Sequence, residues 1–98
     1  MVKHIVLFRL EGEQAKVAQA AADFKKAIEE LPALLPELKS VEVGINDGPA
    51  AGNWTIALTA CCDNYADLEA YSAAPAHVAC VAIIKPLLAG RTCVDYTV

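Results

Sequence analysis

The sequence lacks the features that define several large classes of protein. No apolar run approaches the roughly 18 to 20 residues that a membrane-spanning helix needs, and the N-terminus has neither the apolar core nor the cleavage site of a signal peptide. Lysine and arginine total 8 residues against 12 acidic ones, they are scattered, and the net charge is −4. We therefore expect a cytoplasmic protein with no membrane and no nucleic-acid partner.

Signatures of cofactor, metal and nucleophile sites are also missing. The four cysteines form no C-x-x-C pair, and the adjacent Cys61 and Cys62 cannot easily form an ordinary disulfide, so we expect free thiols in a reducing compartment. No glycine spacing matches a phosphate or dinucleotide loop, and no serine lies in a nucleophile elbow. With two histidines and no carboxylate cluster, the sequence predicts neither a metal site nor a cofactor.

What the chain does have is an excess of apolar residues. They make up 56% of its 98 residues, whereas charged residues make up only 20%. A domain of this size buries only roughly 60 to 65% of its unfolded surface, so its own core cannot take up all of these side chains. Part of the apolar surface must be covered by another molecule, and a second copy of the chain is the simplest cover.

Hydrophobic periodicity divides the single domain, residues 1–98, into a β-α-β-β-α-β order. Period-two patterns predict four strands, at residues 2–10, 38–45, 54–61 and 91–98. Period-3.6 patterns and proline or glycine breaks predict helices, at residues 13–31, about 64–72 and about 75–88, with Gly90 closing the last one. This order is that of the ferredoxin-like α+β fold, in which helices cover one face of a four-stranded antiparallel sheet.

The first strand is apolar on both of its faces. His4, Val6 and Phe8 alternate with Ile5 and Leu7, whereas a strand buried on one face only would alternate apolar with polar residues. We therefore expect this strand in the middle of the sheet, covered on both sides. Because the helices cover only one side, the sequence predicts a homodimer that forms through the other face.

A phenol and an imidazole flank a proline break in the second half of the chain. Pro75 fits the first turn of a helix, because its missing N–H and fixed φ are harmless there. His77 then lies near the positive end of the helix, which disfavours the imidazolium form and keeps a neutral ring available as a base. With Tyr71 on the other side of the break, this segment predicts a small-molecule site.

Three further side chains have more ordinary interpretations. Trp54 and Tyr96 are expected to be core and interface anchors. Asp95 is expected to be a charge partner for Arg9 or Arg91, a kind of surface pair that contributes little to stability.

Several of these features occur together in one known family. They are the opening segment Val2–Phe8, a helix followed by a proline turn, Gly44-x-Asn46, Leu68-x-x-Tyr71-x-x-x-Pro75-x-His77, and the closing Asp95-Tyr96. In this order and spacing the chain resembles the stress-responsive dimeric α/β-barrel (Dabb) family over essentially its whole length. The resemblance implies a homodimer whose two sheets pack face to face to form a barrel, with the helices outside.

The resemblance also implies a site in a cavity between sheet and helices. In the family's polyketide cyclases, a histidine matching His77 acts as base in aldol chemistry, a tyrosine matching Tyr71 assists it, and a histidine matching His4 lines the pocket. The chain departs from the family in two positions, with Ala74 where a histidine is common and Thr55 where the cyclases have a third-strand histidine.

Two main hypotheses for function follow. In the first, the dimer binds a small, hydrophobic carbonyl compound and acts as a cyclase-like or isomerase-like enzyme, in which His77 removes a proton and Tyr71 stabilises the enolate. The pocket is then expected to be lined by His4, Phe8, Thr55 and Val81. In the second, the protein is a non-catalytic, stress-related ligand-binding dimer whose histidines are packed polar groups. The same fold also supports cofactor-free monooxygenases.

Overall fold

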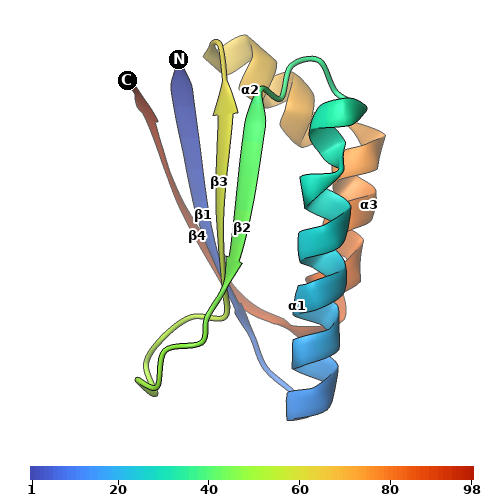
Figure 1. The fold of residues 1–98 in the computed structure, drawn as a ribbon, viewed down its shortest axis with the longest axis vertical. Helices are drawn as coiled ribbons and strands as arrows, with labels where there is room; N and C mark the ends of the chain where they lie inside the picture. Colours follow the sequence, from blue (N-terminus) through green and yellow to red (C-terminus); the bar gives the residue numbers. More distant parts are fainter.

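The computed structural model describes residues 1–98 and confirms the ferredoxin-like α+β fold (Figure 1). Its strands are β1 (Val2–Leu10), β2 (Ser40–Ile45), β3 (Ile56–Cys62) and β4 (Leu88–Thr97). Its helices are α1 (Gln14–Glu29), α2 (Tyr65–Ala73) and α3 (Pro75–Ile84), with 3-10 turns η1 (Leu31–Ala33) and η2 (Lys85–Leu87). The strands pair antiparallel in the order β2-β3-β1-β4, so β1 is central, as its apolar composition predicts.

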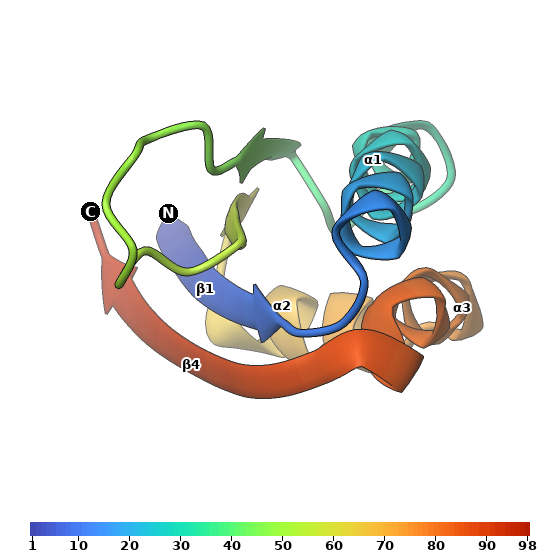
Figure 2. The same ribbon diagram turned by 90° about the horizontal axis from the view of Figure 1, so that it is seen from below.

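The three helices lie on one side of the sheet and leave the other side uncovered (Figures 1 and 2). Along β1, Val6 is 2% exposed on the helix side, whereas Leu7 is 37% exposed on the opposite side. Residues directly opposite each other on neighbouring strands point to the same face. The strand register therefore places these apolar side chains on the outer sheet face, beside the polar Lys3, Thr59 and Thr92: Ile5, Leu7, Ala57, Cys61, Val94 and Tyr96.

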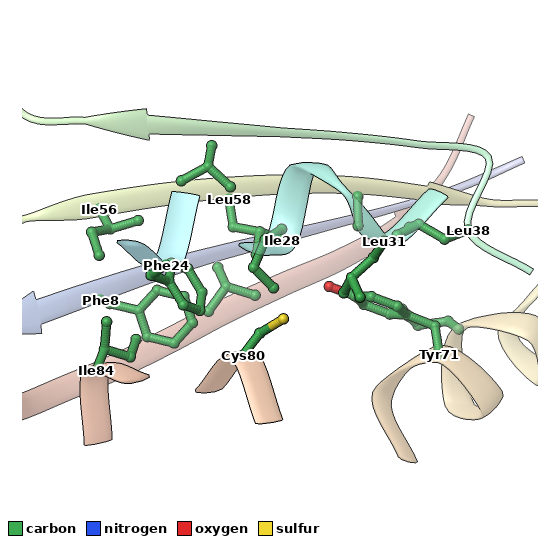
Figure 3. Close-up of a cluster of buried hydrophobic side chains, with 14 of the residues drawn as sticks. Phe8, Phe24, Ile28, Leu31, Leu38, Ile56, Leu58, Tyr71, Cys80 and Ile84 are labelled. Carbon is green, nitrogen blue, oxygen red and sulfur yellow. The ribbon is translucent and has the colours of Figure 1, made fainter. Parts of the chain in front are cut away.

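Side chains fill the layer between sheet and helices (Figure 3). The apolar stripe of α1 contributes Phe24 and Ile28, and both side chains are fully buried. The ring of Phe24 meets that of Phe8 edge to face, with the centroids 5.3 Å apart. The two hollows of the molecule both lie outside this layer. The expected cavity between sheet and helices is therefore absent, because large side chains from both layers interdigitate there.

The structure corrects several predicted boundaries. Helix α3 ends at Ile84, because Pro86 has no N–H to continue the helical hydrogen bonds, and η2 leads directly into β4 at Leu88. Gly90 consequently lies within β4, opposite Arg9, and does not close a helix. A Cβ atom at Gly90 would lie 3.2 Å from the ring of Trp54, so glycine here makes room for that ring rather than for a turn. The second and third strands begin at Ser40 and Ile56 instead of residues 38 and 54.

An ion pair on α1 occupies the free edge of β2. Lys25 Nζ lies 3.0 Å from Glu29 Oε2 and donates to the carbonyl oxygen of Val43 at 2.5 Å. The N–H of Val43 donates to the same Glu29 oxygen at 3.2 Å. Both outward-facing backbone groups of Val43 are therefore satisfied by side chains. We call this arrangement the β2 edge clamp. The hydrogen bond from Lys25 lowers the pKa of Glu29, which keeps the clamp charged.

No single helix is long and apolar enough to cross a membrane. Only the pair formed by α2 and the segment Pro75–Leu87, bent by 63° at the break between them, reaches that length and composition together.

Candidate functional site

The break between α2 and α3 positions His77. Asn64 caps α2 by accepting a hydrogen bond of 2.8 Å from the N–H of Asp67. The helix stops at Ala73, because Ala74 before proline takes an extended conformation, and Pro75 begins α3. His77 therefore faces back across the break, and its Nδ1 lies 3.0 Å from the carbonyl oxygen of Ser72.

This contact fixes the tautomer of His77. A carbonyl oxygen can only accept a hydrogen bond, so Nδ1 carries the proton and donates it to Ser72. The other ring nitrogen, Nε2, consequently carries a lone pair. Burial lowers the pKa of His77, the hydrogen bond to Ser72 opposes this effect, and the charges of His4 and Arg91 lower the pKa further. The imidazole is therefore a neutral base at pH 7.

Tyr71 packs its ring against His77. The ring centroids are 4.6 Å apart and the planes are tilted by 55°. The hydroxyl group turns away into the core toward Cys80 (Figure 3), where it is buried and has no hydrogen-bond partner. Burial raises the pKa of Tyr71 well above its ordinary value, so the group remains a phenol. In this conformation Tyr71 supports the imidazole through its ring.

His4 forms a second imidazole site on the sheet beneath the helices. Its side chain is almost fully buried, and its Nδ1 lies 2.5 Å from Oδ1 of Asp95 on the neighbouring strand. The ring N–H at Nδ1 donates its hydrogen bond to this carboxylate. Asp95 is thus the partner of His4 rather than of an arginine, and Arg9 lies 3.8 Å from Glu11 instead. Sequence reasoning missed this pair because it depends on the register between the first and last strands.

A groove runs along α3 beside His77. It has a volume of about 240 Å³, and we call it the α3 groove. Its lining combines an imidazole, a hydroxyl, an ammonium and aliphatic side chains, contributed by Ser72, His77, Val78, Val81, Ala82 and Lys85. Of the predicted site residues, His77 and Val81 therefore share one surface. Tyr71 lies behind it and is not part of the lining.

The remaining predicted site residues lie elsewhere. Phe8 is buried in the core against Phe24. Thr55 accepts a hydrogen bond of 2.9 Å from the N–H of Leu10 and lines a second hollow of about 490 Å³ on the outer sheet face, together with Leu7 and Trp54. No group of three or more His, Cys, Asp or Glu side chains is placed to hold a metal ion.

The fold and the helix-break histidine define a class, the ferredoxin-like α+β proteins with an uncovered sheet face. The model of the stress responsive A/B barrel domain matches residues 2–98. The chain therefore belongs to the stress responsive A/B barrel (Dabb) family, as its motifs predict.

Similar solved structures come from bacteria and a plant. A dimeric protein of unknown function from Bacteroides fragilis is 39% identical, with a TM-score of 0.95 and coverage of 99% of this chain and 95% of that one. A dimeric ferredoxin-like protein from Thermobifida fusca is 37% identical, with a TM-score of 0.80 and coverage of 99% and 90%. Hydroxynitrile lyase from Passiflora edulis shares the fold at 23% identity, with a TM-score of 0.72 and coverage of 99% and 92%. No relative was found among the curated proteins.

Proposed function

We propose that this protein is a homodimeric acid–base enzyme that acts on a small carbonyl compound, with His77 as its base. The observation that carries the proposal is the fixed tautomer of His77. Its proton is held on Nδ1 by Ser72, its pKa is lowered, and its Nε2 lone pair has no partner within the chain. A neutral, half-buried imidazole of this kind is suited to proton abstraction near pH 7.

The proposed reaction begins with loss of a proton alpha to a carbonyl group. Nε2 of His77 takes the proton, and the electron pair of the C–H bond moves into the carbonyl to give an enolate. The enolate then regains a proton at another carbon, which is an isomerisation, or forms a carbon–carbon bond, which is an aldol-type cyclisation. We assign Tyr71 the role of a positioning residue that holds the imidazole ring, since its hydroxyl is turned into the core.

The proposed dimer forms through the outer sheet face. Ile5, Leu7, Val94 and Tyr96 place an apolar surface there that the helices do not cover. Exposed contiguous apolar surface of this kind is typical of interfaces. The relatives from Bacteroides fragilis and Thermobifida fusca are both described as dimeric, which supports the same assembly for this chain.

A non-catalytic ligand-binding dimer is the alternative. Two observations favour it, since both histidines have a hydrogen-bond partner and the layer between sheet and helices is filled. The enzyme hypothesis and this alternative differ in whether the protein accelerates the breaking of a C–H bond, which can be measured without knowledge of the natural substrate.

The test is exchange of alpha protons for deuterium, followed by proton NMR in D₂O. The probes are 4-oxo-4-phenylbutanoate and its methyl ester, which offer an apolar ring and a ketone with alpha protons. We expect the wild-type protein to accelerate exchange and His77→Gln to lose about a hundredfold or more of that acceleration. Tyr65→Phe, at an exposed tyrosine of α2 outside the groove, is the control and should retain the rate. Acceleration that survives His77→Gln, or exchange no faster than in buffer, would support the non-catalytic alternative.

A further inference from the structure

The helix layer ends at β1 and leaves the same side of β4 open. Three residues of β4 that point toward the helices are exposed, whereas the β1 residues directly opposite them are buried. The pairs are Arg91 with Phe8, Cys93 with Val6, and Asp95 with His4. Figure 2 shows β4 curving away from the helices after it leaves the end of α3. The helix-facing side of β4 is therefore open to solvent beyond the end of α3.

Two cations face this region without an acidic partner. The ion pairs of the chain are formed by His4, Arg9, Lys25 and Lys39, and none of them includes Lys85 or Arg91. Asp95 is the acidic residue on the helix side of β4, and it is engaged by His4. Unpaired cations are notable here, because acidic residues outnumber basic ones 12 to 8 in the whole chain.

One cation lines the groove of His77, and the other lies on the helix-facing side of β4 beside Phe8. Lys85 lines the α3 groove two helical turns after His77, at most about 12 Å farther along the helix axis. Arg91 is close enough for its charge to act on the imidazole of His77, and its Nη1 lies 3.8 Å from Sγ of Cys93 on the same face of β4. The groove thus presents a base at one end, aliphatic side chains along its length and the ammonium group of Lys85 at the other end.

We propose that Arg91, together with Lys85, binds a carboxylate group of the ligand, so that the preferred substrates are oxo acids rather than neutral carbonyl compounds. This assignment rests on the proposed function of His77 and names its substrate class. A guanidinium group can hold a carboxylate through two parallel hydrogen bonds, which positions as well as attracts it. The carbonyl group of the ligand then lies at His77, and the methylene groups between the carbonyl and the carboxylate lie on Val78 and Val81.

The test measures binding separately from turnover. Wild-type protein labelled with ¹⁵N is titrated with 4-oxo-4-phenylbutanoate and, in a second series, with its methyl ester, which differs only in the missing charge. We expect the acid to bind about tenfold or more tightly than the ester and to shift the amide signals of Arg91 and His77, a difference of about 1.4 kcal/mol. Arg91→Gln should abolish this preference, and Lys85→Gln should reduce it.

Arg9→Gln is the matched control. Arg9 lies on β1 next to β4, but its side chain is on the outer sheet face over the ring of Trp54, 5.5 Å from its centroid. Its replacement changes the net charge by the same amount and should leave the preference intact. Equal binding of acid and ester, a preference that survives Arg91→Gln, or no binding of the acid at about 10 mM would each overturn the proposal.

The experiments distinguish failure of the proposed base, His77, from failure of the proposed carboxylate site at Arg91 and Lys85. Acid-specific binding that depends on Arg91, without any proton exchange, refutes the enzymatic role of His77 and leaves the anion site standing. Exchange that depends on His77 and is equally fast for acid and ester refutes the anion site and leaves the base standing.

Discussion

Nδ1 of His77 and the carbonyl oxygen of Ser72 lie 3.0 Å apart across the break between α2 and α3. This bond ties the first turn of one helix to the last turn of the other and selects one of the two neutral forms of the imidazole. The proline that interrupts the helices therefore also sets the protonation geometry of the candidate base.

The lowered pKa of His77 predicts how stability depends on pH. Its pKa in the unfolded chain is about 6.5, and burial lowers the pKa in the folded protein. The contribution of the neutral ring to the free energy of unfolding is therefore complete above pH 6.5. It is lost as the pH falls through 6.5 toward the folded-state pKa.

The measurement is urea unfolding of wild type and His77→Gln over this acidic range. We expect the free energy of unfolding to fall more steeply with acidification in the wild type than in the variant, because glutamine does not titrate. Parallel curves would show that the imidazole has the same proton affinity in the folded and unfolded chains.

The buried hydroxyl of Tyr71 predicts a stabilising substitution. A buried polar group without a hydrogen bond costs about 1 to 3 kcal/mol, and Tyr71→Phe removes this group while it keeps the ring against His77. We expect the variant to be more stable by about 1 kcal/mol and to retain proton exchange. Tyr65→Phe, at an exposed tyrosine of α2, should leave stability unchanged.

This substitution also separates two roles for Tyr71. If its hydroxyl stabilises an enolate, Tyr71→Phe will lose exchange activity although the protein remains folded. If its ring only positions the imidazole, activity will persist in Tyr71→Phe and fall in Tyr71→Ala.

The outer sheet face predicts where a charge disrupts assembly. Leu7→Asp places a carboxylate in the middle of the apolar surface of β1, where burial in a dimer interface would leave it unpaired. We expect this variant to dissociate or unfold. Leu34→Asp makes the same chemical change at an exposed site away from the sheet and should sediment as the wild type does. A Leu7→Asp protein with wild-type sedimentation would assign the interface to another surface.

The β2 edge clamp is expected to slow hydrogen exchange at the edge of the sheet, and this can be tested by removing Glu29. Glu29→Ala removes the carboxylate that accepts the N–H of Val43 and leaves Lys25 without its partner. We expect a loss of about 1 kcal/mol in unfolding free energy and faster hydrogen exchange at the amide of Val43. Glu30→Ala, at the neighbouring exposed carboxylate, is the control. Unchanged exchange at Val43 in Glu29→Ala would mean that the clamp does not protect this edge.

Much of the fold could be predicted from the chain alone. The two apolar faces of β1 placed it in the middle of the sheet, and the break at Pro75 separated α2 from α3, because these signals depend on local periodicity and proline geometry. The start of β4 was misplaced, since glycine commonly ends helices, whereas Gly90 here lies in a strand, close to the ring of Trp54 from a distant loop.

The candidate site also combines features that the local sequence predicts with features that only the tertiary structure reveals. The proximity of Tyr71 and His77 follows from their spacing around one proline. The pair formed by His4 and Asp95 joins residues 91 positions apart, and only the strand register brings them together. The direction of the Tyr71 hydroxyl was equally inaccessible, because it depends on which side chains fill the space between the sheet and helices.

The β2 edge clamp bears on how large an assembly of this protein can become. The outward-facing backbone groups of Val43 are hydrogen-bonded to Lys25 and Glu29. The middle of the β2 edge therefore cannot pair with a further β-strand. Growth of one sheet into the next, the first step toward a fibril, is thereby discouraged on one flank of a very apolar chain. A helix that serves mainly to fill the core thus also helps to keep the association of copies finite.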